Sequence, residues 1–145
     1  MARNVGRMLI RHPEHETILF VEEQKPSVRG QWTIPGGDPL PGETPADAAI
    51  RETGEETGYG AVLLGSEPVH TEHIPEGDID IYIYLGQVSG GLCRVQPGEL
   101  LNARWLSTGQ VQALNERGML RDSFIANLVM SPAVVRPWAG QTLVQ

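Results

Sequence analysis

The sequence predicts a single domain of the α/β (α+β) class, in which short strands surround one well-defined helix. Its 145 residues are enough to bury a hydrophobic core without disulfides or a structural metal. Hydrophobic residues make up 40% of the chain and charged residues 20%, which is ordinary usage for a globular protein. The 17 glycines and 11 prolines indicate many turns between short elements. No repeat or low-complexity block divides residues 1–145.

Strands are predicted from short apolar runs that end at glycine, proline or charged residues. The segments that fit are 5–11, 17–23, 32–34, 61–64, 69–73, 79–88 and a stretch around Trp105. In the clearest one, 79–88, the isoleucines alternate with Tyr82 and Tyr84, so the two sets are expected on opposite faces. A turn is expected at 89–91. A short helix is expected from Ser107 or Thr108 through Asn115, and a second one from Asp122 to about Met130.

The best-defined helix is predicted to begin after Thr44 and to end at Gly58. Thr44 is a favourable N-cap, Pro45 suits the first helical position, and Asp47 complements the positive end of the helix dipole. Gly58 is a natural residue for the left-handed conformation that ends many helices. The small residues expected to form its buried face are Ala46, Ala49, Ile50, Thr53 and Thr57.

Charge and cysteine content exclude several classes of function. The net charge is −7 and the pI is near 5.0, which argues against a nucleic-acid polymer as partner. Small phosphorylated ligands remain compatible, provided that divalent cations mediate their binding. Cys93 is the single cysteine, and no apolar run is long enough for a secretory signal or a membrane span. These features predict a cytoplasmic protein without a membrane partner.

Three carboxylates crowd one side of the predicted helix. Glu52, Glu55 and Glu56 fall within an arc of about 100°. Their mutual repulsion is unfavourable, and Gly54 among them costs roughly 1 kcal/mol more than alanine, so helix propensity does not explain the arrangement. An acidic face exposed to solvent is the simplest reading of an arbitrary charged helix. Here the crowding, and a double-glycine loop just upstream, favour a site for Mg²⁺ or Mn²⁺.

Segment 37–59 resembles the signature box of the Nudix hydrolases (MutT-like proteins). The residues that carry the resemblance are Gly37, Glu43, Arg51, Glu52, Glu55, Glu56 and Gly58. The preceding sequence WTIPG, residues 32–36, is another familiar feature of the family. Thr53 and Tyr59 stand where the family usually has aliphatic residues. Neither departure touches the acidic residues.

The resemblance implies an α/β/α sandwich with a central mixed β-sheet and hydrolysis of a diphosphate linkage in a nucleoside diphosphate derivative. It implies Mg²⁺ as cofactor, with Mn²⁺ as a possible substitute. The metal ligands implied are Glu52, Glu55, Glu56 and the carbonyl of Gly36. The resemblance also implies an ion pair between Glu43 and Arg51 that joins the loop to the helix, with Gly37 and Gly58 as structural support. A later loop is expected to supply one more acid.

Glu99 is the candidate for that acid, because it precedes Trp105 in a stretch that is similar to the corresponding family segment. The weaker candidates are Glu67, Glu72 and Glu76. Either Glu52 or Glu99 could act as the general base, and the sequence does not choose between them.

The substrate is less well specified. Candidate binding residues are Tyr82, Arg29, Phe124 and Asn127; Arg7 and Lys25 could contact phosphate, although exposed surface is the simpler expectation for them. A (d)NTP or related nucleotide is the first expectation. An ADP-ribose or nucleotide-sugar pyrophosphatase is the alternative, to which Pro75 adds weak support. A non-catalytic nucleotide sensor is less favoured, because every acid of the box is present. The small-molecule substrate is the expected partner, and monomer and homodimer are both left open.

Overall fold

The structure is a computed structural model, and it describes residues 2–135. The elements, in chain order, are β1 (Arg3–Ile10), β2 (Thr17–Glu23), a 3-10 turn (Pro26–Val28), β3 (Trp32–Thr33), β4 (Gly36–Gly37), α1 (Pro45–Thr57), β5 (Tyr59–Leu63), β6 (His70–Ile74), β7 (Ile79–Gly91), β8 (Leu100–Ser107), α2 (Thr108–Glu116) and α3 (Phe124–Leu128). None of the helices within the described part of the chain is long and apolar enough to cross a membrane. Residues 1 and 136–145, which the single-domain prediction includes, lie outside the described residues.

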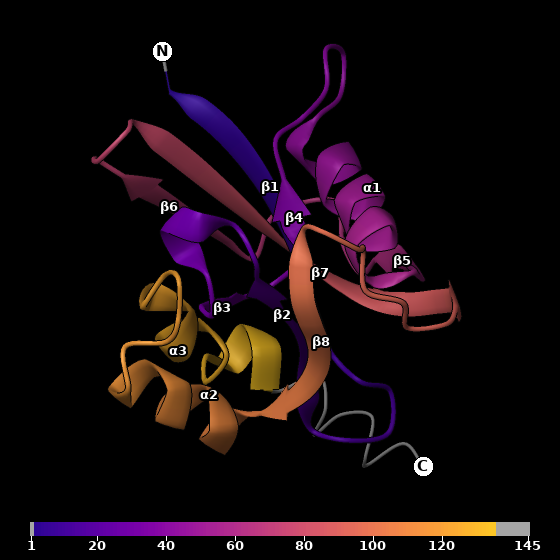
Figure 1. Ribbon diagram of the computed structural model, residues 1–145. Coiled ribbons are helices and arrows are strands. Elements are labelled where there is room, and N and C mark those ends of the chain that lie inside the picture. Colours follow the sequence, from indigo (N-terminus) through magenta and orange to yellow (C-terminus); the bar gives the residue numbers. More distant parts are fainter. Residues whose placement is uncertain (1, 136–145) are drawn as a thin grey trace.

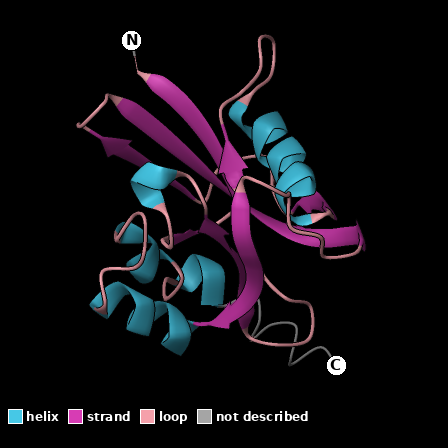
Figure 2. Ribbon diagram, viewed as in Figure 1, coloured by secondary structure: helices cyan, strands magenta, loops and turns pink. Residues whose placement is uncertain are grey.

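The strands form two sheets, with α1 on one side and α2 and α3 on the other (Figures 1 and 2). The larger sheet has the order β4-β1-β7-β5, and β6 also pairs with β7. Its β1 and β7 run parallel, whereas its other pairs are antiparallel, so the sheet is mixed. The smaller sheet is antiparallel, with the order β3-β2-β8. The predicted fold class, with helices around a central mixed sheet, is confirmed.

The alternation of side chains along β1 separates two cores. Val5 and Leu9 face the space between the sheets, where they join the side chains of α2 and α3. Met8 and Ile10 face the other way and pack beneath α1. Arg7 has the same parity as Val5 and Leu9, so this arginine lies on an inner face of the larger sheet.

Helix α1 begins and ends where the sequence predicts. The Thr44 hydroxyl accepts a hydrogen bond from the Asp47 amide at 3.1 Å, and the Asp47 carboxylate accepts one from the Thr44 amide at 3.1 Å. Gly58 adopts a left-handed conformation with φ of 82° at the other end. The first turn of the helix lies against the backbone of β1 at Gly6. A Cβ added to Gly6 would lie only 1.8 Å from the Pro45 carbonyl oxygen. A larger residue at position 6 would push α1 off the sheet.

Two details of the prediction around α1 are wrong. Ile50 is 37% exposed, whereas Ala48, which was not assigned to the buried face, is fully buried. Helix α1 packs on β1, β4 and β5, and the face that it buries includes Ala48 in place of Ile50. The turn expected at 89–91 is the end of β7, where Gly90 and Gly91 pair with β5. Ladder hydrogen bonds to β5 therefore override the turn preference of these glycines.

The last helix is shorter than the sequence suggests. It spans Phe124–Leu128, and Ser123 is its N-cap, without a side-chain hydrogen bond. The expected cap, Asp122, instead accepts a backbone hydrogen bond from Ile125 through its carbonyl at 3.2 Å. The helix is held by packing, since Ile125, Ala126 and Leu128 are buried in the core between the sheets.

Candidate active site

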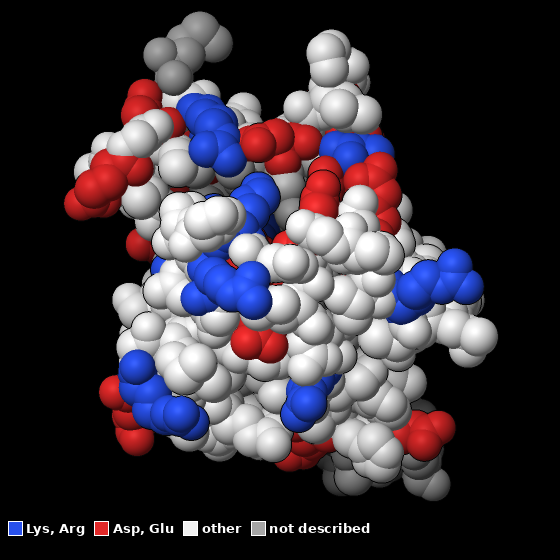
Figure 3. Space-filling model, in the orientation of Figure 1, with Lys and Arg blue, Asp and Glu red and all other residues white. Residues whose placement is uncertain are grey.

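One side of α1 faces a cavity of about 310 Å³. Five acids of the described chain line it together with Gly36. Three of them are predicted site residues, Glu52 and Glu56 from α1 and Glu99 from the turn before β8; the other two are Glu23 and Asp38. Basic residues line it as well, among them Arg7, Lys25 and Arg121. In Figure 3, basic and acidic side chains gather on either side of a hollow next to α1. The cavity therefore presents oxygen ligands and cationic groups to the same small volume.

Glu56 is the most deeply buried of the three carboxylates. The Gly36 amide donates a hydrogen bond to its Oε1 at 3.1 Å. Burial raises the pKa of Glu56 to about 8; this hydrogen bond and the nearby charge of Arg7 only partly oppose the effect. Without further positive charge, the carboxylate is held in an environment that favours its protonated form.

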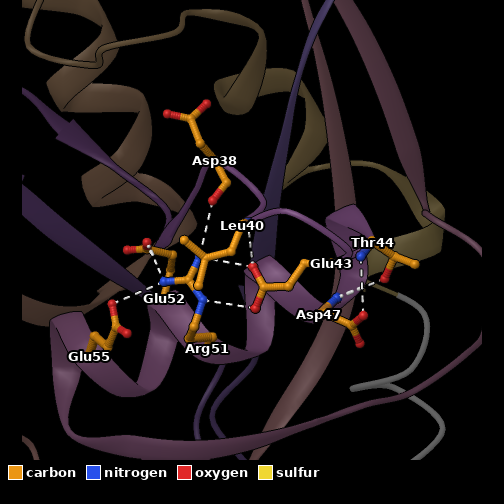
Figure 4. A network of polar contacts seen from close by, with 8 residues as sticks. All are labelled: Asp38, Leu40, Glu43, Thr44, Asp47, Arg51, Glu52 and Glu55. Carbon is orange, nitrogen blue, oxygen red and sulfur yellow. Dashed lines mark hydrogen bonds and ion pairs between the residues drawn. The ribbon is translucent and has the colours of Figure 1, made fainter.

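Arg51 organises the surface next to this cavity, as Figure 4 shows. Its Nε and Nη2 donate to the two carboxylate oxygens of Glu43 at 2.9 and 3.0 Å, so the pair is bidentate. Nη2 also donates to the Asp38 carbonyl at 3.0 Å. The Glu43 carboxylate accepts a further bond from the Leu40 amide at 2.8 Å, and these contacts lower the pKa of Glu43. The predicted ion pair is present, and it joins the loop to the helix.

The same guanidinium holds two of the predicted metal ligands. Its Nη1 donates to Glu52 at 2.8 Å and to Glu55 at 3.2 Å. Glu52 nevertheless has a raised pKa, because its partial burial outweighs the stabilisation by Arg51. The Glu55 side chain is 49% exposed and borders a neighbouring groove with Leu92 in place of the main cavity. Arg51 thus keeps Glu52 at the cavity and Glu55 at its edge.

Because Gly37 has no side chain, the side chain of Glu52 can lie directly against its backbone. A Cβ at this position would lie 2.9 Å from both Cγ and Cδ of Glu52. Any side chain at position 37 would therefore displace the Glu52 carboxylate. This close approach is sufficient reason for a glycine at position 37, whatever its backbone angles.

The donor set fits a hard divalent cation. Carboxylate and carbonyl oxygens are the ligands that Mg²⁺ and Mn²⁺ prefer. Glu52, Glu56, Glu99 and Gly36 supply such groups around one cavity. A cation there would offset the burial that raises the pKa of Glu56 to about 8. As the side chains stand, no three acidic, histidine or cysteine side chains among residues 2–135 are grouped tightly enough to hold a metal ion. Arg51 contacts only Oε1 of Glu52, which leaves Oε2 for a cation. Binding would require the side chains to draw closer together.

The four predicted substrate-binding residues do not line this cavity. Tyr82 packs in the cluster beneath α1, on the face of β7 that points away from the space between the sheets. Phe124 and Asn127 border a separate groove beside His70. Arg29 is exposed on the loop after β2.

Three charged residues on the inner wall were missed or misjudged. Arg7 is 7% exposed, so the expectation of a solvated side chain is wrong. Glu23 is also buried, and it forms an ion pair with Arg121 at 3.5 Å. Strand alternation around Val5 was the available signal for Arg7. Glu23 on β2 and Arg121 meet because the segment before α3 pairs with Trp32 of β3, the neighbour of β2, which no local pattern reveals.

Comparison with known proteins identifies the family. A profile of the NUDIX domain matches residues 2–128. The chain belongs to the Nudix family. The predicted enzyme class, a Nudix pyrophosphohydrolase, is thereby confirmed. Nudix hydrolases generally use a divalent metal, in keeping with the oxygen ligands described above.

Curated relatives of this Nudix protein include enzymes of oxidised nucleotides. A putative 8-oxo-dGTP diphosphatase of Bacillus subtilis (strain 168) is 31% identical over 106 residues, which cover 73% of this chain and 68% of that protein. An 8-oxo-dGDP phosphatase of Homo sapiens is 32% identical over 97 residues, which cover 63% of this chain and 28% of that protein. This chain therefore spans about two thirds of the bacterial relative and less than a third of the human one.

Solved structures of the same family share the fold. A NUDIX hydrolase from Nitrosomonas europaea superimposes with a TM-score of 0.74 at 20% identity, over 90% of this chain and 87% of the other. An Ap4A hydrolase from C. elegans gives a TM-score of 0.67 at 17% identity, over 97% and 99%. At these identities the likeness concerns the fold alone.

Proposed function

We propose that this protein hydrolyses a diphosphate linkage in a nucleoside diphosphate derivative, with Mg²⁺ as cofactor, and that its substrate is a (d)NTP or a related nucleotide. The observation that carries the proposal is the convergence of Glu52, Glu56, Glu99 and Gly36 on one cavity. The similarity to the Bacillus subtilis protein supports a triphosphate substrate. We further propose that residues 1–145 form one domain, which acts as a monomer or homodimer.

The acidic residues of the cavity would hold the cation. Glu52, Glu56 and Glu99, with the Gly36 carbonyl, are the nearest oxygen donors, and Glu55 lies at the edge of the same site. A divalent cation, when bound, neutralises charge on phosphate oxygens and lowers the pKa of a bound water. Glu56 has the most to gain, because burial raises its pKa to about 8 when no cation is present.

The remaining chemistry is a proton transfer and a displacement. Water attacks one phosphorus of the diphosphate, a new P–O bond forms, and the bond to the bridging oxygen breaks, so that the other phosphate leaves. A carboxylate accepts the proton of the attacking water. Glu52 and Glu99 are the two candidates. The raised pKa of Glu52 brings this base closer to neutral pH, and Arg51 orients its carboxylate at 2.8 Å.

A nucleotide panel tests this function. Purified protein is incubated with dNTPs, 8-oxo-dGTP, nucleoside diphosphates, ADP-ribose and nucleotide sugars, with Mg²⁺ or with EDTA, and the products are separated by ion-exchange chromatography. We expect turnover that requires Mg²⁺, release of phosphate or pyrophosphate, and loss of activity in Glu56→Gln but not in Glu67→Gln. Turnover of ADP-ribose in place of the triphosphates would overturn the proposed substrate class. Equal turnover in EDTA would overturn the proposed metal-dependent mechanism.

A further inference from the structure

Arg7 is a buried cation that the proposed reaction leaves without a role. It lies on β1, where its neighbours in register are Gly36 on β4 and Ile83 on β7. Its side chain is on the inner face of the sheet, and the residue is 7% exposed. The remaining exposure is toward the cavity that Glu52 and Glu56 also line.

The hydrogen bonds of Arg7 are incomplete. Its Nη1 donates to the Ile34 carbonyl oxygen at 2.9 Å, which fixes the guanidinium in place. Its buried Nε has no hydrogen-bond partner. Among residues 2–135, no carboxylate forms an ion pair with Arg7 within 4.0 Å. Burial lowers the pKa of Arg7, although Asp122, Glu56 and Glu23 attract its charge from a distance. A buried charge without a direct ion pair is unfavourable, so packing alone gives no reason for an arginine here.

The position of Arg7 relative to the carboxylates is set by Gly36. The arginine stem crosses this residue so closely that a Cβ at position 36 would lie 2.7 Å from Arg7 Cγ. The amide of the same glycine binds Glu56 at 3.1 Å. Arg7 and the carboxylate site are therefore adjacent, with only one glycine between them.

Four more cationic side chains of the described residues line the same cavity: Arg3, Lys25, Arg51 and Arg121. Lys25 is exposed, and Arg121 approaches Glu23 at 3.5 Å, which is longer than a hydrogen bond. Arg121 can thus donate hydrogen bonds to a bound anion without losing a strong contact with Glu23. The cavity also has few apolar side chains, and no aromatic one is among those that line it. Glu23 and Asp38 also line it, and they already form ion pairs with Arg121 and Arg3. With five cations and no aromatic side chain among the described residues, the lining suits a chain of phosphates better than a nucleobase.

We propose that Arg7, with Arg121 beside it, binds a substrate phosphate that lies next to the carboxylate site and outside it. The guanidinium group matches the geometry of phosphate oxygens and binds them through paired, charge-assisted hydrogen bonds. The inference rests on the proposed function and sharpens it: a substrate with a third phosphate gains this contact, whereas a diphosphate joined to a sugar does not. Arg7 is then a residue that determines specificity.

Metal-free binding of inorganic tripolyphosphate tests the subsite without catalysis. Calorimetric titrations in EDTA at low salt compare the wild type with Arg7→Met, Arg7→Lys and the control Arg117→Gln, which removes an exposed charge outside this cavity. We expect Arg7→Met to weaken binding by about 10- to 100-fold, since hydrogen bonds to a charged group are lost. Arg7→Lys should fall between, because it keeps the charge and loses the fork. Arg117→Gln should bind like the wild type.

Steady-state kinetics supply the second readout. For Arg7→Lys, whose melting is first checked against the wild type, KM for a triphosphate should rise while KM for a nucleoside diphosphate stays within twofold. The absence of tripolyphosphate binding to the wild type, or binding by Arg7→Met within twofold of the wild type, would overturn the subsite. Equal KM effects on the two substrates would overturn its role in specificity. If tripolyphosphate binds through Arg7 but no nucleotide is hydrolysed, the proposed function fails and the anion site stands.

Discussion

Replacement of Glu56 by glutamine should stabilise the metal-free protein at neutral pH. The folded-state pKa of Glu56 is raised from 4.5 to about 8, mainly by burial. The folded protein therefore binds this proton more tightly than the unfolded chain does. The resulting stability is fully present below pH 4.5 and is lost as the pH rises through 8.

The size of the effect follows from the two pKa values. Each pH unit between 4.5 and 7 reduces the free energy of unfolding by about 1.4 kcal/mol, so the loss reaches about 3 kcal/mol at pH 7. Glutamine has nearly the same shape, carries no charge and keeps an oxygen that can accept the Gly36 hydrogen bond. Glu56→Gln should thus exceed the wild type by about 3 kcal/mol at pH 7, but by only about 1 kcal/mol at pH 5.

Urea unfolding in EDTA, followed by fluorescence of the three tryptophans, measures this difference at both pH values. A difference that does not depend on pH would refute the reasoning, because it would arise from packing and not from ionisation. A less stable variant at pH 7 would refute it as well. With Mg²⁺ added, the stability advantage of Glu56→Gln over the wild type should shrink, since only the wild type keeps the Glu56 carboxylate proposed to bind the cation.

Three other outcomes are expected. Gly37→Ala should lower kcat about tenfold or more with little change in melting temperature, because the new Cβ displaces the Glu52 carboxylate; the control Gly65→Ala, which has open space around it, should leave kcat unchanged. Saturation with Mg²⁺ at ten times its Kd should raise the free energy of unfolding by about 1.4 kcal/mol, and differential scanning fluorimetry with chelator would contradict this if the melting temperature stayed the same. In a double-mutant cycle of urea unfolding, Arg51→Met and Glu43→Gln should show a coupling energy that falls with salt; strictly additive effects would argue against the bidentate pair.

The parts of the fold that depend on local sequence were predictable. Thr44 and Gly58 fix the ends of α1 through hydrogen bonds to residues three or four positions away in the chain. The alternation of Ile81 and Ile83 with Tyr84 correctly separates the two faces of β7. The ion pair of Glu43 with its arginine was also within reach, because both belong to one short segment.

The parts that depend on contacts between distant segments were not. Ile50 lies outside the face of α1 that is buried against β1, β4 and β5, and β4 is only two residues long. Gly91 lies in a strand because β5 pairs with it. Glu55 turns toward Arg51 and away from the cavity, a choice among rotamers that spacing does not decide. Arg7 faces inward through strand parity, yet the charges of Glu23 and Arg121 near it come from elsewhere in the chain.

The central claim is that the carboxylates around Gly36 hold a divalent cation and catalyse cleavage of a diphosphate. The most direct test is the rate of hydrolysis of the best nucleotide substrate by the wild type, Glu56→Gln and the control Glu67→Gln, each measured with Mg²⁺ and with EDTA. The account predicts turnover by the wild type and by Glu67→Gln that disappears in EDTA, and a loss of at least 100-fold, roughly the size of effect seen when a key charge-stabilising group is removed, in Glu56→Gln. Hydrolysis by Glu56→Gln at the wild-type rate, or undiminished hydrolysis in EDTA, would contradict it.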